Sequence, residues 1–299
     1  MNLLRILDKL YYLCPQSRFV WRSIRYCIRV LTNIYARFFM SVLQKRTAVG
    51  KDTIIVSLTS FPARINSVWM TVASILNQSY ENLHIILWLS EKQFNGGDSI
   101  PKQLIDLIKN GFEIRFVDDD LRPHKKYFYV MQEFPDNDVI TVDDDIIYHP
   151  DLIQTLVNAH IKHPNCVICN RGTSIDRGNY SSWKTVKAID EERVDILPTG
   201  IGGVYYPSHT FDNTPIFDKE AIKHTCLNGD DLWLNFMTRL NGHKVVYTGF
   251  NTGLVTILSS QSSALCNDNI KENHNDLQIK NITNWAQDNL NCDFYVNIN

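Results

Sequence analysis

The N-terminal region lacks any uncharged apolar run of the roughly 18 residues needed to span a bilayer, and its charges interrupt the apolar core that a signal peptide requires. The chain has no Gly-x-x-x-x-Gly-Lys motif, which argues against a P-loop enzyme, and no internal repeat. Its seven cysteines are scattered and odd in number, which favours a reducing compartment. Cys166 and Cys169 have no second pair to complete a zinc site, so we expect them in a buried strand.

Positive charge is scarce in most of the chain and concentrated at its start. The 299 residues have a formal net charge of -2, but residues 1–46 contain nine Lys or Arg and one acid, Asp8, which leaves -10 on the remainder. An acidic main body argues against nucleic acid as a partner, because phosphates demand a basic surface. The partner of the basic segment must be of another kind.

Residues 1–48 form a basic segment with helical periodicity. Apolar residues recur every three or four positions on one side of the predicted helix: Trp21, Ile24, Ile28, Leu31, Tyr35, Phe38 and Val42. Arginines fall on a different side: Arg18, Arg22, Arg25 and Arg29. This pattern predicts an amphipathic helix that binds an anionic membrane surface through residues 18–44. The alternative is a helix packed on the main domain or on a partner chain.

From residue 49 onward the pattern changes to short apolar runs that alternate with helical segments. Strands are predicted at 53–58, 84–89, 113–117 and 138–142, and helices at 66–77, between Pro101 and Gly111, at 125–133 and at 232–240. Such alternation predicts an α/β fold with a mostly parallel sheet flanked by helices, and a ligand site at the carboxyl ends of the strands. We place the main domain at 49–255 and a packed tail at 256–299, with a helix near 276–289.

Three aspartates, Asp143, Asp144 and Asp145, follow the fourth predicted strand directly. Adjacent carboxylates repel one another unless a cation or hydrogen-bond donors compensate them. Oxygen ligands at this place suit Mg²⁺ or Mn²⁺, whose remaining positions go to diphosphate oxygens and water. A solvated acidic turn is the alternative.

The segment Val142-Asp-Asp-Asp-Ile-Ile-Tyr148 resembles the Asp-X-Asp motif of GT-A (Rossmann-like) glycosyltransferases, and its surroundings resemble the family 2-like bacterial enzymes that build surface polysaccharides. Four other pieces agree in order between about 52 and 250: Ser57–Arg64, His124–Tyr127, Pro198–Tyr206 and Asn228–Trp233.

The resemblance implies roles for individual residues. It assigns Asp231 as the base that deprotonates the acceptor hydroxyl, with Asp230 in support, although both also suit the start of a helix. Metal ligands are expected at Asp143, Asp145 and His274, with His243 as another candidate for the histidine. Donor contacts are expected from Thr59, Arg64, Asp119, Lys125, Lys126, Asp143, Asp144, Gly202 and Gly203. A diphosphate leaving group needs positive charge beyond one divalent ion, so we expect one of the two lysines to reach the donor site. Their spacing in the sequence does not show which one.

The resulting hypothesis is a metal-dependent, inverting glycosyltransferase at the cytoplasmic face of a membrane. The donor would be a nucleotide-diphosphate sugar, with UDP-sugar preferred, and the acceptor a hydroxyl of a glycan or a lipid-linked glycan. Two alternatives stay open: a nucleotidyl or phosphosugar transferase, and a non-catalytic nucleotide-sugar-binding or scaffold subunit.

Overall fold

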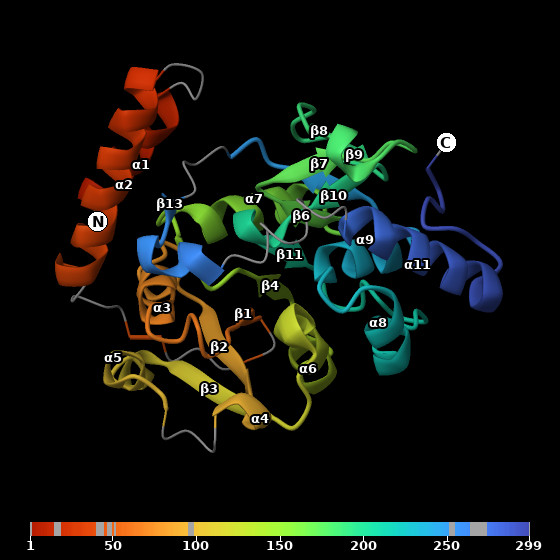
Figure 1. The fold of residues 1–299 in the computed structure, drawn as a ribbon, viewed down its shortest axis with the longest axis horizontal. Coiled ribbons are helices and arrows are strands. Elements are labelled where there is room, and N and C mark those ends of the chain that lie inside the picture. Colours follow the sequence, from red (N-terminus) through yellow and green to blue (C-terminus); the bar gives the residue numbers. More distant parts are fainter. Residues whose placement is uncertain are drawn as a thin grey trace.

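A computed structural model describes residues 2–14, 19–39, 45–46, 50, 52–94, 99–250, 255–263 and 274–298. An eight-stranded sheet forms its centre, in the order β3-β2-β1-β4-β11-β6-β12-β9, with helices on both faces (Figure 1). The strands of this sheet are β1 (Ile54–Thr59), β2 (Leu83–Ser90), β3 (Phe112–Val117), β4 (Val139–Thr141), β6 (Val167–Cys169), β9 (Glu192–Arg193), β11 (Val204–Tyr206) and β12 (Val245–Tyr247). The predicted α/β class is therefore confirmed.

Strand direction divides this sheet into two parts. Neighbours are parallel from β3 to β4, and β6 is parallel to β12. Between these parts lies β11, which is antiparallel to both β4 and β6, and β9 is antiparallel to β12 at the far edge. The four predicted strands correspond to β1, β2, β3 and β4, whereas the antiparallel strands were not predicted.

Helices cover the sheet because their apolar sides match the apolar faces of the strands. The longer ones in the main domain are α3 (Val68–Leu76), α6 (Lys125–Glu133), α7 (Leu152–Lys162), α8 (Lys219–Thr225), α9 (Asp230–Leu240) and α11 (His274–Leu290). The predicted helices at 66–77, 125–133, 232–240 and 276–289 are confirmed as α3, α6, α9 and α11. The prediction between Pro101 and Gly111 corresponds to two short pieces, α5 (Lys102–Ile105) and a 3-10 turn, Ile108–Asn110.

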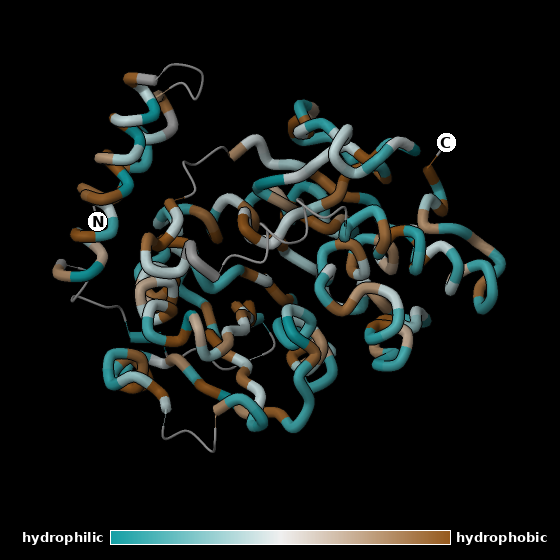
Figure 2. Tube along the Cα trace, in the orientation of Figure 1, coloured by the Kyte–Doolittle hydropathy of each residue, from teal (hydrophilic) through white to brown (hydrophobic). Residues whose placement is uncertain are grey.

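The interior consists of several apolar clusters. One lies between the sheet and α3 and α7, and a second joins α8, α9 and α11 to the β6–β12 side. Figure 2 shows that hydrophobic segments gather in the central strands, while α11 at the edge of the domain is largely hydrophilic. Cys166 and Cys169 are buried and unpaired on the β6 side, as the strand interpretation predicts.

Smaller sheets add to the edges. One has the order β10-β7-β8, with β7 at Gly172–Ser174, β8 at Lys184–Thr185 and β10 at Ile196–Pro198. The other pairs β5 (Ile146–Ile147) with β13 (Val255–Thr256), directly after the acidic cluster. The chain therefore returns to the acidic segment late in the sequence.

Two N-terminal helices, α1 (Asn2–Leu13) and α2 (Phe19–Phe39), pack against each other beside α3 and β13 (Figure 1). The helix α1 was not predicted. Of the predicted membrane-binding range, Arg18 and residues 40–44 lie outside the described residues. Within the described residues, no helix combines the length and the apolar character needed to cross a membrane.

Candidate active site

Polar segments from distant parts of the chain meet at the edge of the sheet where β1 and β4 end. The acidic cluster follows β4, and the segment that contains Arg64 follows β1. The strand β11 runs the opposite way, with Val204 paired to Thr141, so the glycine turn before it reaches the same edge. The first turns of α6 and α9 complete the site.

Lys126 is the centre of this arrangement. Its Nζ lies 2.9 Å from Oδ1 of Asp143 and 2.7 Å from Oδ2 of Asp230, and its side chain is only 5% exposed. One ammonium group thus connects the acidic segment after β4 to the start of α9. The sequence could not choose between the two lysines, and the structure places Lys126 among the aspartates.

The electrostatics of the site depend on this lysine. Burial alone would lower the pKa of Lys126, but Asp143, Asp230 and Asp231 together raise it well above its usual value. Burial is the largest cause that raises the pKa of Asp231 to about 8, and repulsion from Asp230 is the second. Lys126 opposes this rise. The result is one buried cation that partly compensates three carboxylates.

Asp231 and the glycine turn are joined directly. The backbone N–H of Gly200 donates to the Asp231 carboxylate, at 3.1 Å from Oδ1 and 3.3 Å from Oδ2. A β-carbon at Gly200 would lie 2.7 Å from Nζ of Lys126 and 2.8 Å from Oδ1 of Asp143. Any larger residue would therefore push into the lysine–aspartate pair.

Arg64 holds the other two aspartates of the cluster. Its Nη1 lies 2.5 Å from Oδ1 of Asp144, and its Nη2 lies 3.3 Å from Oδ2 of Asp145. The hydroxyl of Ser60 donates to the other oxygen of Asp144 at 2.6 Å. Arg64 was expected to contact the donor, but in this structure it forms ion pairs with two carboxylates.

The three aspartates differ in accessibility. Asp144 is buried, whereas Asp143 and Asp145 are partly exposed. Burial raises the pKa of Asp145 to about 6, with Arg64 opposing the rise and Asp143 adding to it. Burial also raises the pKa of Asp144 despite Arg64 and Ser60. The outer two carboxylates are therefore the ones that a ligand or a metal ion can reach.

The oxygen donors of Asp143 and Asp145 fit a hard divalent ion in chemical type. Within the described residues, no group of three or more His, Cys, Asp or Glu side chains is arranged to hold a metal ion. The expected third ligand, His274, is the first residue of α11, one turn before Gln278. The side-chain oxygen of Gln278 lies 2.7 Å from where a β-carbon of Gly229 would be, so this side of α11 approaches the start of α9.

Three expected donor-binding residues have partners elsewhere in the protein. Thr59 donates its hydroxyl to the carbonyl oxygen of Trp88 at 2.8 Å. Asp119 pairs with Lys219 at 2.6 Å. Lys125 is buried and pairs with Asp120 at 2.5 Å, so it turns away from the acidic cluster.

Gly202 and Gly203 shape the turn rather than line its open side. A β-carbon at Gly202 would lie 2.7 Å from Cβ of Arg171, and Gly203 has a φ of +76°, which an L side chain rarely adopts. The other histidine candidate, His243, is partly exposed, and its Nδ1 lies 2.9 Å from the carbonyl oxygen of Asn165.

Sequence reasoning missed some residues of the site. Ser60 and Gly200 lie inside segments that were recognised, but neither was assigned a role. His124 was also missed: it is fully buried, with Nδ1 2.8 Å from Oη of Tyr127 and Nε2 2.8 Å from the carbonyl oxygen of Cys226. Burial lowers its pKa to about 4, so the neutral ring ties the start of α6 to the turn before α9.

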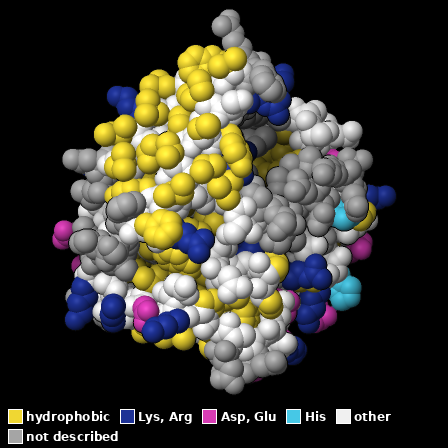
Figure 3. Space-filling view, turned by 60° about the vertical axis from the view of Figure 1, so that its left-hand side comes forward, with side chains coloured by type: hydrophobic (Ala, Val, Ile, Leu, Met, Phe, Trp, Pro, Cys, Tyr) yellow, Lys and Arg dark blue, Asp and Glu magenta, His cyan; other side chains and the backbone are white. Residues whose placement is uncertain are grey.

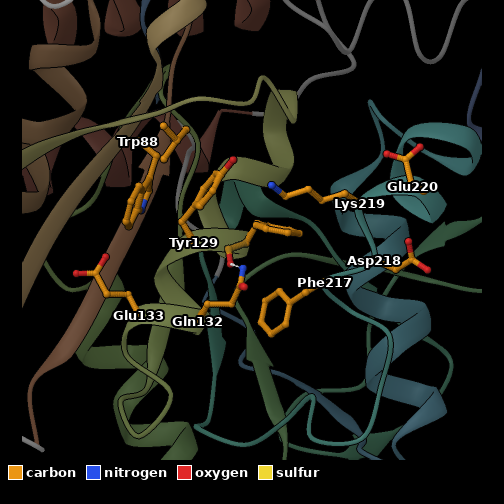
Figure 4. Close-up of a pocket in the computed structure, with 10 residues that line it drawn as sticks. Trp88, Tyr129, Gln132, Glu133, Phe217, Asp218, Lys219 and Glu220 are labelled. Carbon is orange, nitrogen blue, oxygen red and sulfur yellow. Dashed lines mark hydrogen bonds between the residues drawn. The ribbon is translucent and has the colours of Figure 1, made fainter.

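A separate groove lies between α6 and α8, with a volume of about 780 Å³. Trp88 and Tyr129 lie on one side of it and Phe217 and Lys219 on the other (Figure 4). The rings of Trp88 and Tyr129 stack with their centroids 5.6 Å apart. None of the predicted site residues lines this groove.

No protein-family model matches the sequence, and no curated protein matches it. Among solved structures, the chain is similar to the mannosyltransferase PcManGT from Pyrobaculum calidifontis in complex with GDP-Man and Mn²⁺, at 10% identity and a TM-score of 0.44, covering 82% of this chain and 68% of that one. It is also similar to S. aureus TarS 1–349 in complex with UDP, at 11% identity and a TM-score of 0.43, covering 67% of this chain and 58% of that one.

A third structure is apo UDP-glucose pyrophosphorylase, at 12% identity and a TM-score of 0.41, covering 71% of this chain and 97% of that one. Similarity at this level is not evidence for a function of this chain.

Proposed function

We propose that the chain is a metal-dependent glycosyltransferase of the GT-A type. It would move a sugar from a nucleotide-diphosphate donor, with UDP-sugar preferred, to a hydroxyl of a glycan or a lipid-linked acceptor in surface polysaccharide synthesis. The observation that carries this proposal is the meeting of the Asp143–Asp145 segment with the Asp230–Asp231 pair around Lys126. At one edge of the sheet, the Asp143–Asp145 segment can hold the donor, and the Asp230–Asp231 pair can accept a proton.

In this proposal Asp231 is the general base. It is partly exposed, whereas Asp230 is buried, so Asp231 is the one that an acceptor can reach. Its carboxylate takes the hydroxyl proton as the acceptor oxygen bonds to the anomeric carbon, and the bond between that carbon and the diphosphate oxygen breaks. A single displacement of this kind inverts the configuration.

Asp143 and Asp145 would hold a divalent ion, with His274 as a third ligand. When bound, such an ion neutralises charge on the leaving diphosphate. Lys126 places a second positive charge beside Asp143, where it can stabilise the same developing charge. Ser60 and Arg64 keep Asp144 fixed, which orients the carboxylates on either side of it.

The remaining predicted donor contacts have a geometric basis in the strands that end at this edge. Thr59 ends β1, and Asp119 follows β3. The nucleotide would lie across these strand ends, where open α/β sheets bind their ligands. Lys125, Gly202 and Gly203 would support the walls of the site from behind.

Thermal unfolding of the purified protein with UDP, GDP and dTDP, each with and without Mn²⁺, tests this proposal first. A ligand that binds only the folded state raises the melting temperature. We expect a metal-dependent rise with one nucleotide, lost in Asp145→Asn and kept in Asp136→Asn, whose side chain is 67% exposed at another place. A melting temperature that no nucleotide changes would favour the scaffold alternative.

The nature of the product then separates two enzyme classes. A glycosyltransferase that hydrolyses its donor slowly releases nucleoside diphosphate, whereas a nucleotidyltransferase forms or consumes pyrophosphate. We expect nucleoside diphosphate release that is lost in Asp231→Asn. Detection of pyrophosphate as the product would refute the glycosyltransferase proposal and favour a nucleotidyltransferase.

A further inference from the structure

The outer side of the two N-terminal helices carries an unusual share of the exposed apolar residues. Of fifteen large hydrophobic residues exposed in the described part of the chain, ten lie on α1 and α2. They are Leu3, Ile6, Leu10, Leu13, Val20, Ile24, Tyr26, Leu31, Ile34 and Phe38. Figure 3 shows hydrophobic side chains crowded over this side of the molecule, with Lys and Arg at its margin.

Nine of these residues, all except Tyr26, form one apolar face across both helices, whereas Tyr26 lies among the arginines. On α1 the exposed residues recur at three- and four-residue spacing, and on α2 Val20, Ile24, Leu31 and Phe38 fall within one stripe at about 100° per residue. The buried sides of the helices are different ones: Leu4 and Ala36 pack towards α3 and β13. The apolar face is therefore additional to the contact that holds the helices on the domain.

Arg25 fixes the two helices relative to each other. Its Nη1 donates to the carbonyl oxygens of Tyr11 at 3.1 Å and Cys14 at 3.0 Å, at the end of α1. Its guanidinium also lies 4.0 Å from the centroid of the Tyr11 ring. One arginine from α2 thus satisfies carbonyl groups at the C-terminus of α1, which orders the shared face.

A basic hollow of about 370 Å³ lies beside this face. It is lined by Tyr11, Arg22, Arg25, Tyr26 and Arg29. Arg22 lies about half a turn from Val20 on α2, so the arginines do not interrupt the apolar stripe. The buried Nε of Arg29 has no hydrogen-bond acceptor among the described residues, which leaves a donor for an anion.

We propose that α1 and α2 together dock the protein on an anionic phospholipid bilayer. The apolar face enters the boundary between headgroups and acyl chains, and the basic hollow takes a lipid phosphate. Charge complementarity selects this partner: α2 carries Arg22, Arg25, Arg29 and Arg37 and no acid, and the one acid of α1, Asp8, is buried. A second copy of the chain would instead bring two such basic segments together, which like-charge repulsion disfavours.

The test is co-sedimentation of the full chain with vesicles of phosphatidylcholine alone and of phosphatidylcholine mixed equally with phosphatidylglycerol. We expect binding mainly to the anionic vesicles. Leu31→Glu and Phe38→Glu should each weaken it roughly tenfold or more, because an apolar side chain no longer leaves water. The matched control is Ile161→Glu, since Ile161 is 71% exposed on α7 and should not affect binding.

A second experiment tests the role of the basic hollow. Arg22→Ala should reduce the preference for anionic vesicles roughly fivefold, and added salt should reduce it in the wild type as well. Sedimentation equilibrium without lipid tests whether a second copy of the chain covers the apolar face instead. A dimer that Leu31→Glu dissociates, or equal failure to bind both kinds of vesicle, would overturn the proposal, and neither result would bear on the proposed transferase activity.

Discussion

Replacing Lys126 by methionine should destabilise the protein strongly, because it leaves Asp143 and Asp230 without their shared cation. Removing one partner of a buried ion pair costs about 3–5 kcal/mol. The side chain of Asp143 is 33% exposed, and Asp230 is 10% exposed, so water can compensate the first but hardly the second. We therefore expect the lower end of the range, about 3 kcal/mol in the free energy of unfolding.

The pH dependence of the Lys126→Met effect follows from the carboxylates. Lys126 opposes the rise in the pKa of Asp231, so without the lysine that pKa rises further above its value of about 8. A carboxylate whose folded-state pKa is raised contributes stability at low pH that is lost as the pH rises through that pKa. The deficit of Lys126→Met relative to wild type should therefore be smallest in acid and grow as the pH rises past about 8. Chemical unfolding at several pH values, with EDTA to exclude metal, measures it directly.

Lys219→Met is the matched control for Lys126→Met. Lys219 also pairs with an aspartate, Asp119, but its side chain is 41% exposed, so its loss should cost no more than about 1 kcal/mol. A chain of this size loses about 2 °C in melting temperature per kcal/mol, which gives roughly 6 °C for the Lys126 variant. Equal melting temperatures of the two variants, or a deficit that does not change with pH, would refute the reasoning.

Three further substitutions test other contacts of the site. The raised pKa of Asp231, about 8, means that the wild type should lose stability as the pH rises from about 4 to 8. Unfolding curves of Asp231→Asn should lack this loss, and those of the control Asp136→Asn should keep it. Gly200→Ala should lower donor hydrolysis roughly tenfold or more with a small change in melting temperature, because the new methyl group displaces the lysine–aspartate pair. Ser60→Ala should cost about 1–2 kcal/mol in chemical unfolding, because it removes a hydrogen bond to the buried carboxylate of Asp144, and an unchanged midpoint would contradict that bond.

Much of the fold could be predicted because each element carries its own periodicity. The runs at 54–59 and 83–90 are mostly apolar and almost fully buried, as strands covered on both faces require. The direction of β11 could not be predicted in this way, because Val204-Tyr-Tyr206 has the same local pattern whether it runs parallel or antiparallel. The order of strands in space is a property of the whole chain.

The candidate site was predictable in its segments but less so in its individual residues. Lys125 and Lys126 are adjacent, and only the turn of about 100° between neighbouring helical residues sends one to Asp120 and the other to Asp143. Gly200 could not be separated from Gly202 and Gly203 by sequence, since all three are small. The contact that distinguishes it is made with residues far away in the chain.

The antiparallel course of β11 has a consequence for how the protein can vary. Gly200 is held on two sides, since β11 is in register with β4 and Pro198 of β10 pairs with Gly172 of β7. The excursion from 175 to 195 leaves and returns between these anchored strands. Insertions and deletions in the parts of the excursion outside the paired strands β8 and β9 can therefore remodel the surface while Gly200 keeps its place against Asp143. In the proposed transferase, loop exchange there would be the way to alter the choice of acceptor.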